Sequence, residues 1–169
     1  MGIEASDIVA AAAVGLGATV VMDLWNLFLK RAFGVASLDY RLLGRWILHM
    51  PEGRFRHAWI AEAAPRTFEG PVGWIAHYSI GAVFAAGLVV LTSGAWLSRP
   101  TLLPALAYGI ATVVFPYFLL QPALGFGLAA SRTPKPTQAR LKSLMTHAVF
   151  GVGLYLAALG VNHLMRALS

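Results

Sequence analysis

The sequence predicts an all-α, polytopic membrane protein that forms a single membrane domain, a bundle of four transmembrane helices. Hydrophobic residues make up 58% of the 169 residues and charged residues only 12%. The mean hydropathy of +0.68 is too apolar for a soluble domain of this size. Four apolar runs approach the roughly 20 residues that a membrane-crossing helix needs. The runs are continuous rather than alternating, which excludes a transmembrane barrel.

Two long polar connections separate the predicted spans. The spans cover residues 8–29, 72–91, 102–120 and about 141–164, and the long connections cover 30–71 and 121–140. In the first connection, Arg41 and Arg45 share one face and apolar residues form the other, which predicts a short helix over 41–50 lying on the membrane surface. A second short helical piece is expected over 57–63. The glycine- and proline-rich stretch 125–140 is predicted to be an ordered loop.

Positive charge is concentrated in the long connections and at their edges. Eleven of the thirteen lysines and arginines lie there, and only Arg99 and Arg166 lie on the opposite side. The excess of positive charge on cytoplasmic loops predicts that both connections are cytoplasmic and that both termini are outside. The basic residues are not interleaved with aromatic residues that would stack on bases, so we expect no nucleic-acid partner. The expected environment is the lipid bilayer.

Short sequence matches suggest that the chain contains two parallel two-helix repeats. Ala18-Thr-Val-Val21 recurs as Ala111-Thr-Val-Val114, an offset of 93 residues. His77 and His147, 70 residues apart, are each followed four residues later by glycine. Such a repeat relates the two helix pairs by an axis along the membrane normal. In that arrangement the two histidines face one another across the bundle.

Asp23 and the two histidines form the candidate site. An ionisable group in a bilayer costs roughly 2.5 kcal/mol or more, so intramembrane acids and imidazoles mark functional sites more often than structural contacts. The first span reaches Asp23 late, while the second and fourth spans meet His77 and His147 within two turns, so all three lie at similar depth. The other polar residues expected near these three are Thr19, Asn26, Tyr78 and Gln121. The alternative is that these groups only hold the helices together through interhelical hydrogen bonds.

The second connection offers a separate candidate site for an anion or a lipid headgroup. Its members are Ser131, Arg132, Thr133, Lys135 and Arg140. The alternative is a hydrophilic turn whose charges only set the topology. No phosphate-loop or dinucleotide-binding spacing is present.

Three longer motifs resemble a known family. They are Gly17-Ala-Thr-Val-Val-Met-Asp-Leu-Trp25, Gly73-Trp-Ile-Ala-His-Tyr-Ser-Ile-Gly81, and residues 121–136 followed by Arg140-Leu-Lys-Ser-Leu-Met-Thr-His147. Over nearly the whole chain the sequence resembles the domain of unknown function 2938 family of small bacterial inner-membrane proteins. The resemblance implies a bacterial, multi-pass inner-membrane protein with four spans, in which the termini that the charge bias places outside are periplasmic. It implies no activity, so no catalytic residue is assigned.

Several functions remain open for the Asp23, His77 and His147 cluster. The first is proton-linked binding or passage of a small solute or cation, since histidine titrates near neutral pH. Because four helices enclose only a thin pore, passage suggests a homodimer or a larger membrane complex. The second is a metal site formed by the three residues, or haem ligated by both histidines with Gly81 and Gly151 leaving room for the ring. A lipid-phase enzyme, which the motifs support least, and a non-catalytic subunit of a membrane complex are further alternatives.

Overall fold

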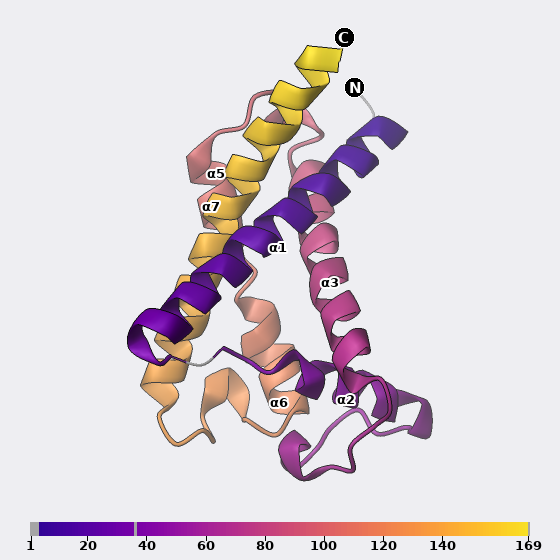
Figure 1. The fold of residues 1–169 in the computed structure, drawn as a ribbon, viewed down its shortest axis with the longest axis vertical. Coiled ribbons are helices and arrows are strands. Elements are labelled where there is room, and N and C mark those ends of the chain that lie inside the picture. The colour runs from indigo at the N-terminus through magenta and orange to yellow at the C-terminus, as the bar shows by residue number, and fades with distance from the viewer. Residues whose placement is uncertain (1–3, 36, 169) are drawn as a thin grey trace.

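The computed structural model describes residues 4–35 and 37–168, and these residues form helices and no strand (Figure 1). Four helical segments are long and apolar enough to cross a membrane. They are α1 (Ala5–Phe33), α3 (Glu69–Leu91), a broken segment that begins with α5 (Leu102–Ala111) and runs to residue 123, and α7 (Pro136–Leu168). Each predicted span lies within one of these segments, and the all-α four-helix fold is confirmed.

The third span is not one continuous α-helix. After α5 ends, a turn at Thr112 and Val113 leads through one more helical turn into a wider π-helical turn, Pro116–Leu120, and then into α6 (Gln121–Ala123). Pro116 begins the π turn because proline has no N–H to continue the α-helical hydrogen bonds. Freed carbonyls at this level need other partners, and π turns inside helices are frequent at functional sites.

The four spans are arranged as a row of packed helices that is open on one side. Helix α1 crosses the front of the molecule in Figure 1 and contacts both α3 and α7, and α7 in turn contacts α5. Between α3 and α5 there are few direct contacts. The spans therefore follow one another around the bundle in sequence order, as expected, but the side between the second and third spans is not closed by helix packing.

Glycines bring the helices of each pair into close contact. A Cβ atom at Gly15 of α1 would lie 2.5 Å from the Gly81 carbonyl oxygen of α3, and one at Gly109 of α5 would lie 2.4 Å from Gly151 Cα of α7. Gly81 and Gly151 are the residues that follow the two histidines by one turn. The first and second helix pairs thus pack in the same manner, which agrees with the predicted parallel repeats.

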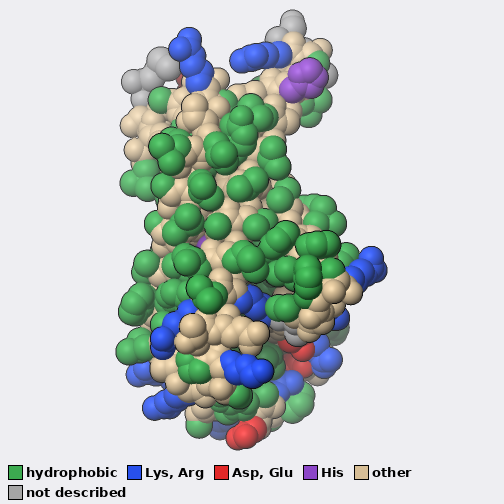
Figure 2. Space-filling view, turned by 90° about the vertical axis from the view of Figure 1, so that its left-hand side faces the viewer, with side chains coloured by type: hydrophobic (Ala, Val, Ile, Leu, Met, Phe, Trp, Pro, Cys, Tyr) green, Lys and Arg blue, Asp and Glu red, His purple; other side chains and the backbone are tan. Residues whose placement is uncertain are grey.

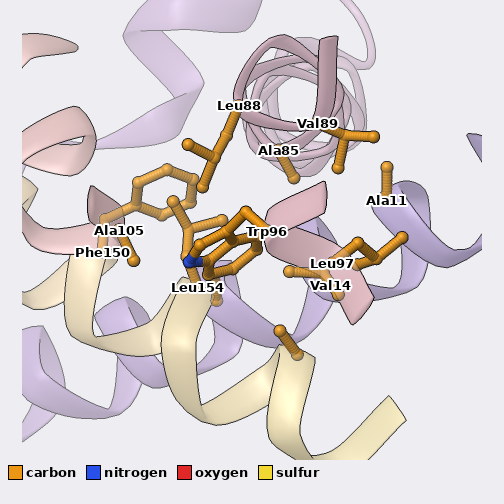
Figure 3. Packing of buried hydrophobic residues seen from close by; sticks show 12 residues of the cluster. Ala11, Val14, Ala85, Leu88, Val89, Trp96, Leu97, Ala105, Phe150 and Leu154 are labelled. Carbon is orange, nitrogen blue, oxygen red and sulfur yellow. The ribbon is translucent and has the colours of Figure 1, made fainter. Parts of the chain in front are cut away.

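The hydrophobic core lies toward the end of the bundle that carries the termini (Figures 1 and 3). Leu88 and Val89 of α3 pack there with Phe150 and Leu154 of α7. The short helix α4 (Ala95–Ser98) adds Trp96 and Leu97 to this cluster. Because two large side chains of α4 enter between the spans, the core closes that end of the bundle.

The basic end of the bundle carries a platform built from the first connection. It comprises α2 (Tyr40–His49), a 3-10 turn at Met50–Glu52 and another at Ile60–Glu62. The amphipathic helix was predicted at this position, and the structure adds that Arg45, on its charged face, is buried against Glu69 of α3. The expected second helical piece is reduced to the 3-10 turn because the backbone N–H groups of His57 and Ile60 bond to the carbonyls of Ala123 and Leu124 instead.

The second connection is mostly irregular, as predicted for its first part. It contains a 3-10 turn at Leu128–Ala130, and α7 then begins at Pro136, inside the stretch that was expected to be loop. Proline is favoured in the first turn of a helix, which explains this start. In the space-filling view, apolar side chains cover the middle of the molecule while lysines and arginines gather at its lower end (Figure 2). This surface suits a bilayer with a basic face on one side.

Candidate functional site

Asp23 and His77 form a hydrogen-bonded pair between α1 and α3. His77 Nε2 lies 3.0 Å from Asp23 Oδ1. Both side chains are largely shielded, with 9% of the His77 side chain and 19% of the Asp23 side chain exposed. The contact gives Asp23 Oδ1 a partner from the neighbouring helix, which a buried carboxylate oxygen requires. The structure therefore brings together two of the three residues that the sequence singled out.

Tyr40 of α2 completes this pair. Its hydroxyl donates a hydrogen bond of 3.2 Å to Asp23 Oδ1, and its ring stacks on the His77 imidazole with 3.9 Å between the centroids. Burial and the negative charge of Asp23 both raise the pKa of Tyr40, so its hydroxyl remains a donor at any physiological pH. We call Asp23, His77 and Tyr40 the Asp–His–Tyr cluster.

A salt bridge and a backbone contact hold α2 so that Tyr40 reaches the pair. Arg45 donates to both carboxylate oxygens of Glu69, at 2.8 and 3.1 Å, and these bonds raise the pKa of Arg45 further. The remaining Arg45 nitrogen donates to three backbone carbonyls of residues 60–63. The backbones of α2 and α3 also pack closely, since a Cβ at Gly73 would lie 1.8 Å from the Tyr40 carbonyl oxygen. Gly73 of α3 therefore packs against α2 rather than against another span.

His147 belongs to a second polar contact, between α5 and α7. Its Nδ1 lies 2.8 Å from Thr112 Oγ1, and the same hydroxyl lies 2.6 Å from the Gly109 carbonyl oxygen. Thr112 is the residue that corresponds to Thr19 in the proposed repeat. Thr19 likewise bonds back to its own helix, at the carbonyl of Gly15. Each histidine is thus bonded to the other helix of its own pair.

A cavity of about 710 Å³ lies between α3 and the third span and extends to the platform. Both His77 and His147 line it, together with Thr19, Asn26 and Gln121. Most of the remaining lining is apolar, including Phe84 and Phe115, whose ring centroids are 4.9 Å apart across the open side of the bundle. The cavity therefore connects the two histidine contacts.

The predicted three-residue cluster is divided between two helix pairs. Within residues 4–35 and 37–168 there is no group of three histidines, cysteines or carboxylates placed to hold a metal ion. The space that Gly81 and Gly151 were expected to leave for a haem ring is filled by the neighbouring helices. A Cβ at Gly81 would lie only 2.0 Å from Thr19 Oγ1. The geometry gives these glycines a packing role.

The other predicted polar residues lie around the same cavity or the cluster. Asn26 is buried at its edge, and Gln121 donates through Nε2 to Ser143 Oγ at 3.4 Å, while its buried Oε1 has no hydrogen-bond partner among the described residues. Tyr78 lies beside the pair, with its ring centroid 5.5 Å from that of His77. Ser143 and Lys142 also line the cavity, although neither was among the predicted site residues. They precede His147 by four and five residues on the same helix, and this spacing was the available signal in the sequence.

The predicted anion loop is ordered, but its members do not converge. Arg140 Nε donates to the Ala129 carbonyl at 2.8 Å, and Thr133 Oγ1 donates to the Ala130 carbonyl, also at 2.8 Å. Ser131 and Arg132 are exposed. Lys135 and Thr133 instead face a second groove, between α1 and α7. Two of the five residues therefore share a concave surface.

Comparison with known proteins identifies one family. The family model described as protein of unknown function (DUF2938) matches residues 12–161, which include all members of the Asp–His–Tyr cluster as well as Thr112 and His147. Neither the curated proteins nor the solved structures provide a match. The family model covers most of the chain, and it includes three of the motifs noted above. The chain therefore belongs to the DUF2938 family of proteins of unknown function.

Proposed function

We propose that this protein binds a small, largely apolar solute in the cavity between α3 and the third span, and that binding is linked to a proton held by Asp23 and His77. The observation that carries the proposal is the position of His77. It lines the cavity and is at the same time bonded to Asp23, which does not line it. A solute in the cavity thus reaches the carboxylate through the imidazole, the group best suited to exchange protons near neutral pH.

The lining supports a neutral or anionic solute rather than an inorganic cation. Apart from the two histidines, Lys142 is the one charged residue among the described residues that line the cavity. Hydroxyls and amides of Thr19, Asn26 and Gln121 offer hydrogen bonds, while aromatic and aliphatic side chains form the rest. Ligand cavities of this size usually combine an apolar lining with a few polar groups that fix orientation. We infer an amphipathic molecule that enters from the bilayer through the open side.

Binding is better supported than passage through a rigid bundle. The core cluster around Trp96 and Leu97 closes the end that carries the termini. Passage requires movement, and the break in the third span between Thr112 and Pro116 is the natural hinge for it. The proposal includes a homodimer or a larger complex in which the open sides of the bundles meet. The proposed setting is the bacterial inner membrane, with the basic platform cytoplasmic and the termini periplasmic.

Small molecules that co-purify with the protein test the binding site. The wild type and a Ser79→Trp variant, which fills the cavity from α3, are purified from native membranes, and their organic extracts are compared by mass spectrometry. We expect an amphipathic molecule of low mass to be enriched with the wild type and lost from the variant. A Ser98→Trp variant, at an exposed position outside the cavity, is the matched control. Equal extracts from all three proteins would defeat the proposed binding site.

Proton linkage is tested with the detergent-solubilised protein in a weakly buffered solution that contains a pH-sensitive dye. Addition of the wild-type extract is expected to change the pH in proportion to the amount of protein, because binding takes up or releases a proton, and an Asp23→Asn variant is expected to abolish that change. Asp7→Asn, which removes a carboxylate from the other end of α1, serves as the control. If the Asp23→Asn protein responds like the wild type, the proton role of the pair is wrong even where binding persists.

A further inference from the structure

A second groove lies at the basic end of the bundle and is distinct from the cavity of the proposed function. It has a volume of about 710 Å³ and lies between the end of α1 and the start of α7. The wall contributed by the end of α1 is apolar and carries Leu29 and Phe33. Phe33 is 68% exposed, so this wall is not covered by the rest of the chain.

The opposite wall is polar and positively charged. It carries Thr133, Lys135 and Lys142, and no acidic residue occurs among the described residues that line the groove. Three of the basic residues, Lys30, Arg31 and Lys135, are exposed at this end. The view that faces the left side of Figure 1 shows lysine and arginine side chains gathered at this lower end, beneath the apolar band (Figure 2). A groove with one apolar and one cationic wall therefore opens where a membrane surface is expected.

We infer that this groove binds an anionic phospholipid, with the phosphate of the headgroup against Lys135 and Lys142 and the first part of an acyl chain along Leu29 and Phe33. Basic pockets at the ends of transmembrane helices recognise anionic headgroups through charge. Free phosphate would use the lysines but not the apolar wall. A zwitterionic lipid would use the apolar wall but gain less from the lysines. Because the groove offers both apolar contacts and lysine charges, it selects a lipid with net negative charge.

This site revises the role of the second connection. Of the five residues predicted to form an anion loop, the site uses Thr133 and Lys135, while Arg132 lies outside the groove lining and Arg140 bonds to the Ala129 carbonyl. Lys142 lines both the groove and the central cavity. A lipid phosphate at the groove is therefore placed beside a residue that also lines the cavity, although the inference does not depend on what the cavity binds.

The test is native mass spectrometry of the purified protein in detergent, with phosphatidylglycerol and phosphatidylcholine of identical acyl chains as probes. We expect the wild type to prefer phosphatidylglycerol. Lys135→Gln should lower that affinity about five-fold, the effect of one lysine charge near an anionic surface. Lys135→Arg keeps the charge and should retain the preference. Arg132→Gln, which removes the same charge from the same connection outside the groove, should leave it unchanged.

Three results would overturn the inference. Equal binding of the two lipids shows that charge does not select the occupant. An equal loss in Arg132→Gln and Lys135→Gln shows attraction to the whole basic face rather than to this groove. Displacement of phosphatidylglycerol by millimolar inorganic phosphate assigns the lysines to a free anion. Because Lys135 is exposed, its variants should fold, and an unchanged thermal unfolding transition in detergent establishes that they do.

Discussion

The two hydrogen-bond partners of Asp23 were not equally predictable from the sequence. Its bond to His77 was predictable, because both residues lie at one depth on faces made of small and polar residues. The bond from Tyr40 was not, because Tyr40 lies in a connection whose fold depends on tertiary contacts. Hydropathy fixes depth along a span, but it carries no information about which surface helix folds back against it.

The hydroxyl of Tyr40 should contribute measurably to stability. Tyr40→Phe keeps the ring stacked on His77 but removes the donor to Asp23, and hydrogen bonds to charged groups contribute about 1.5 kcal/mol. We expect a lower thermal unfolding temperature in detergent. The control Tyr155→Phe, on α7 against the core cluster, should change it less. Equal effects of the two substitutions would contradict a special role for Tyr40.

His57 should make the platform sensitive to acid. Burial and the positive charges of His49 and Arg54 lower its pKa. A histidine with a lowered pKa in the folded state stabilises the fold fully above its unfolded pKa of about 6.5, and that stability falls as the pH drops below it. We expect amide hydrogen exchange in residues 54–63 to quicken between pH 7.5 and 5, after correction for the intrinsic exchange rate.

The matched variants separate His57 from other titrating groups. His57→Gln should weaken the pH dependence of exchange in residues 54–63, whereas His163→Gln, at the opposite end of the chain, should leave it intact. A platform whose corrected exchange is the same at both pH values would show that His57 does not control its stability.

At the level of elements, α2 depends on backbone contact rather than on its amphipathic pattern. The apolar and charged faces predicted a helix at the membrane surface, and a helix is present. Its pattern did not predict that Arg45 would be buried against Glu69, since a charged face is usually solvated. The residues that decide this are Gly44 and Gly73, which allow the two backbones to approach closely enough for the salt bridge to form.

Gly73→Ala should therefore separate α2 from α3. The added Cβ would overlap the Tyr40 carbonyl oxygen, and overpacking of this kind costs about 1 to 3 kcal/mol. We expect a lower unfolding temperature together with loss of the solute-dependent pH change, because Tyr40 moves away from Asp23. Gly160→Ala on α7 has open space around the new atom and should be neutral. A stable Gly73→Ala protein with unchanged activity would contradict the positioning role of α2.

The third span shows a second limit of prediction at this scale. Its apolar length predicted one helix, and the length was right. The apolar pattern did not indicate that α5 ends at Ala111, before Thr112 and Pro116. A proline alone produces anything from a slight kink to a complete break, and packing against α7 decides which one forms.

For the whole molecule, the number and order of the spans were predictable from hydropathy, and the open side was not. Contact between two helices depends on the sizes of facing side chains, and Phe84 and Phe115 hold the second and third spans apart at the cavity. Asp23, His77 and His147 were candidates from the sequence, but neither Tyr40 nor the division of the histidines between two helix pairs was predicted. Each histidine bonds within its own pair because the glycines one turn later bring those helices closest.

The orientation of the whole molecule is testable because the chain contains no cysteine. Ser98→Cys and Ser131→Cys each place a single thiol at an exposed position, one at the end with the termini and one at the basic end. With a membrane-impermeant maleimide we expect labelling of Ser98→Cys in intact cells, and labelling of Ser131→Cys after lysis alone. The reverse pattern would invert the proposed topology.

The Asp–His–Tyr cluster draws all its members from residues 23–77, and the salt bridge that positions it spans residues 45–69. During synthesis these residues leave the ribosome before any residue of the third span. Because domains and their parts fold from the N-terminus as the chain emerges, we expect the Asp–His–Tyr cluster to be complete in the membrane first. The cavity then forms around a finished cluster when the second pair is inserted.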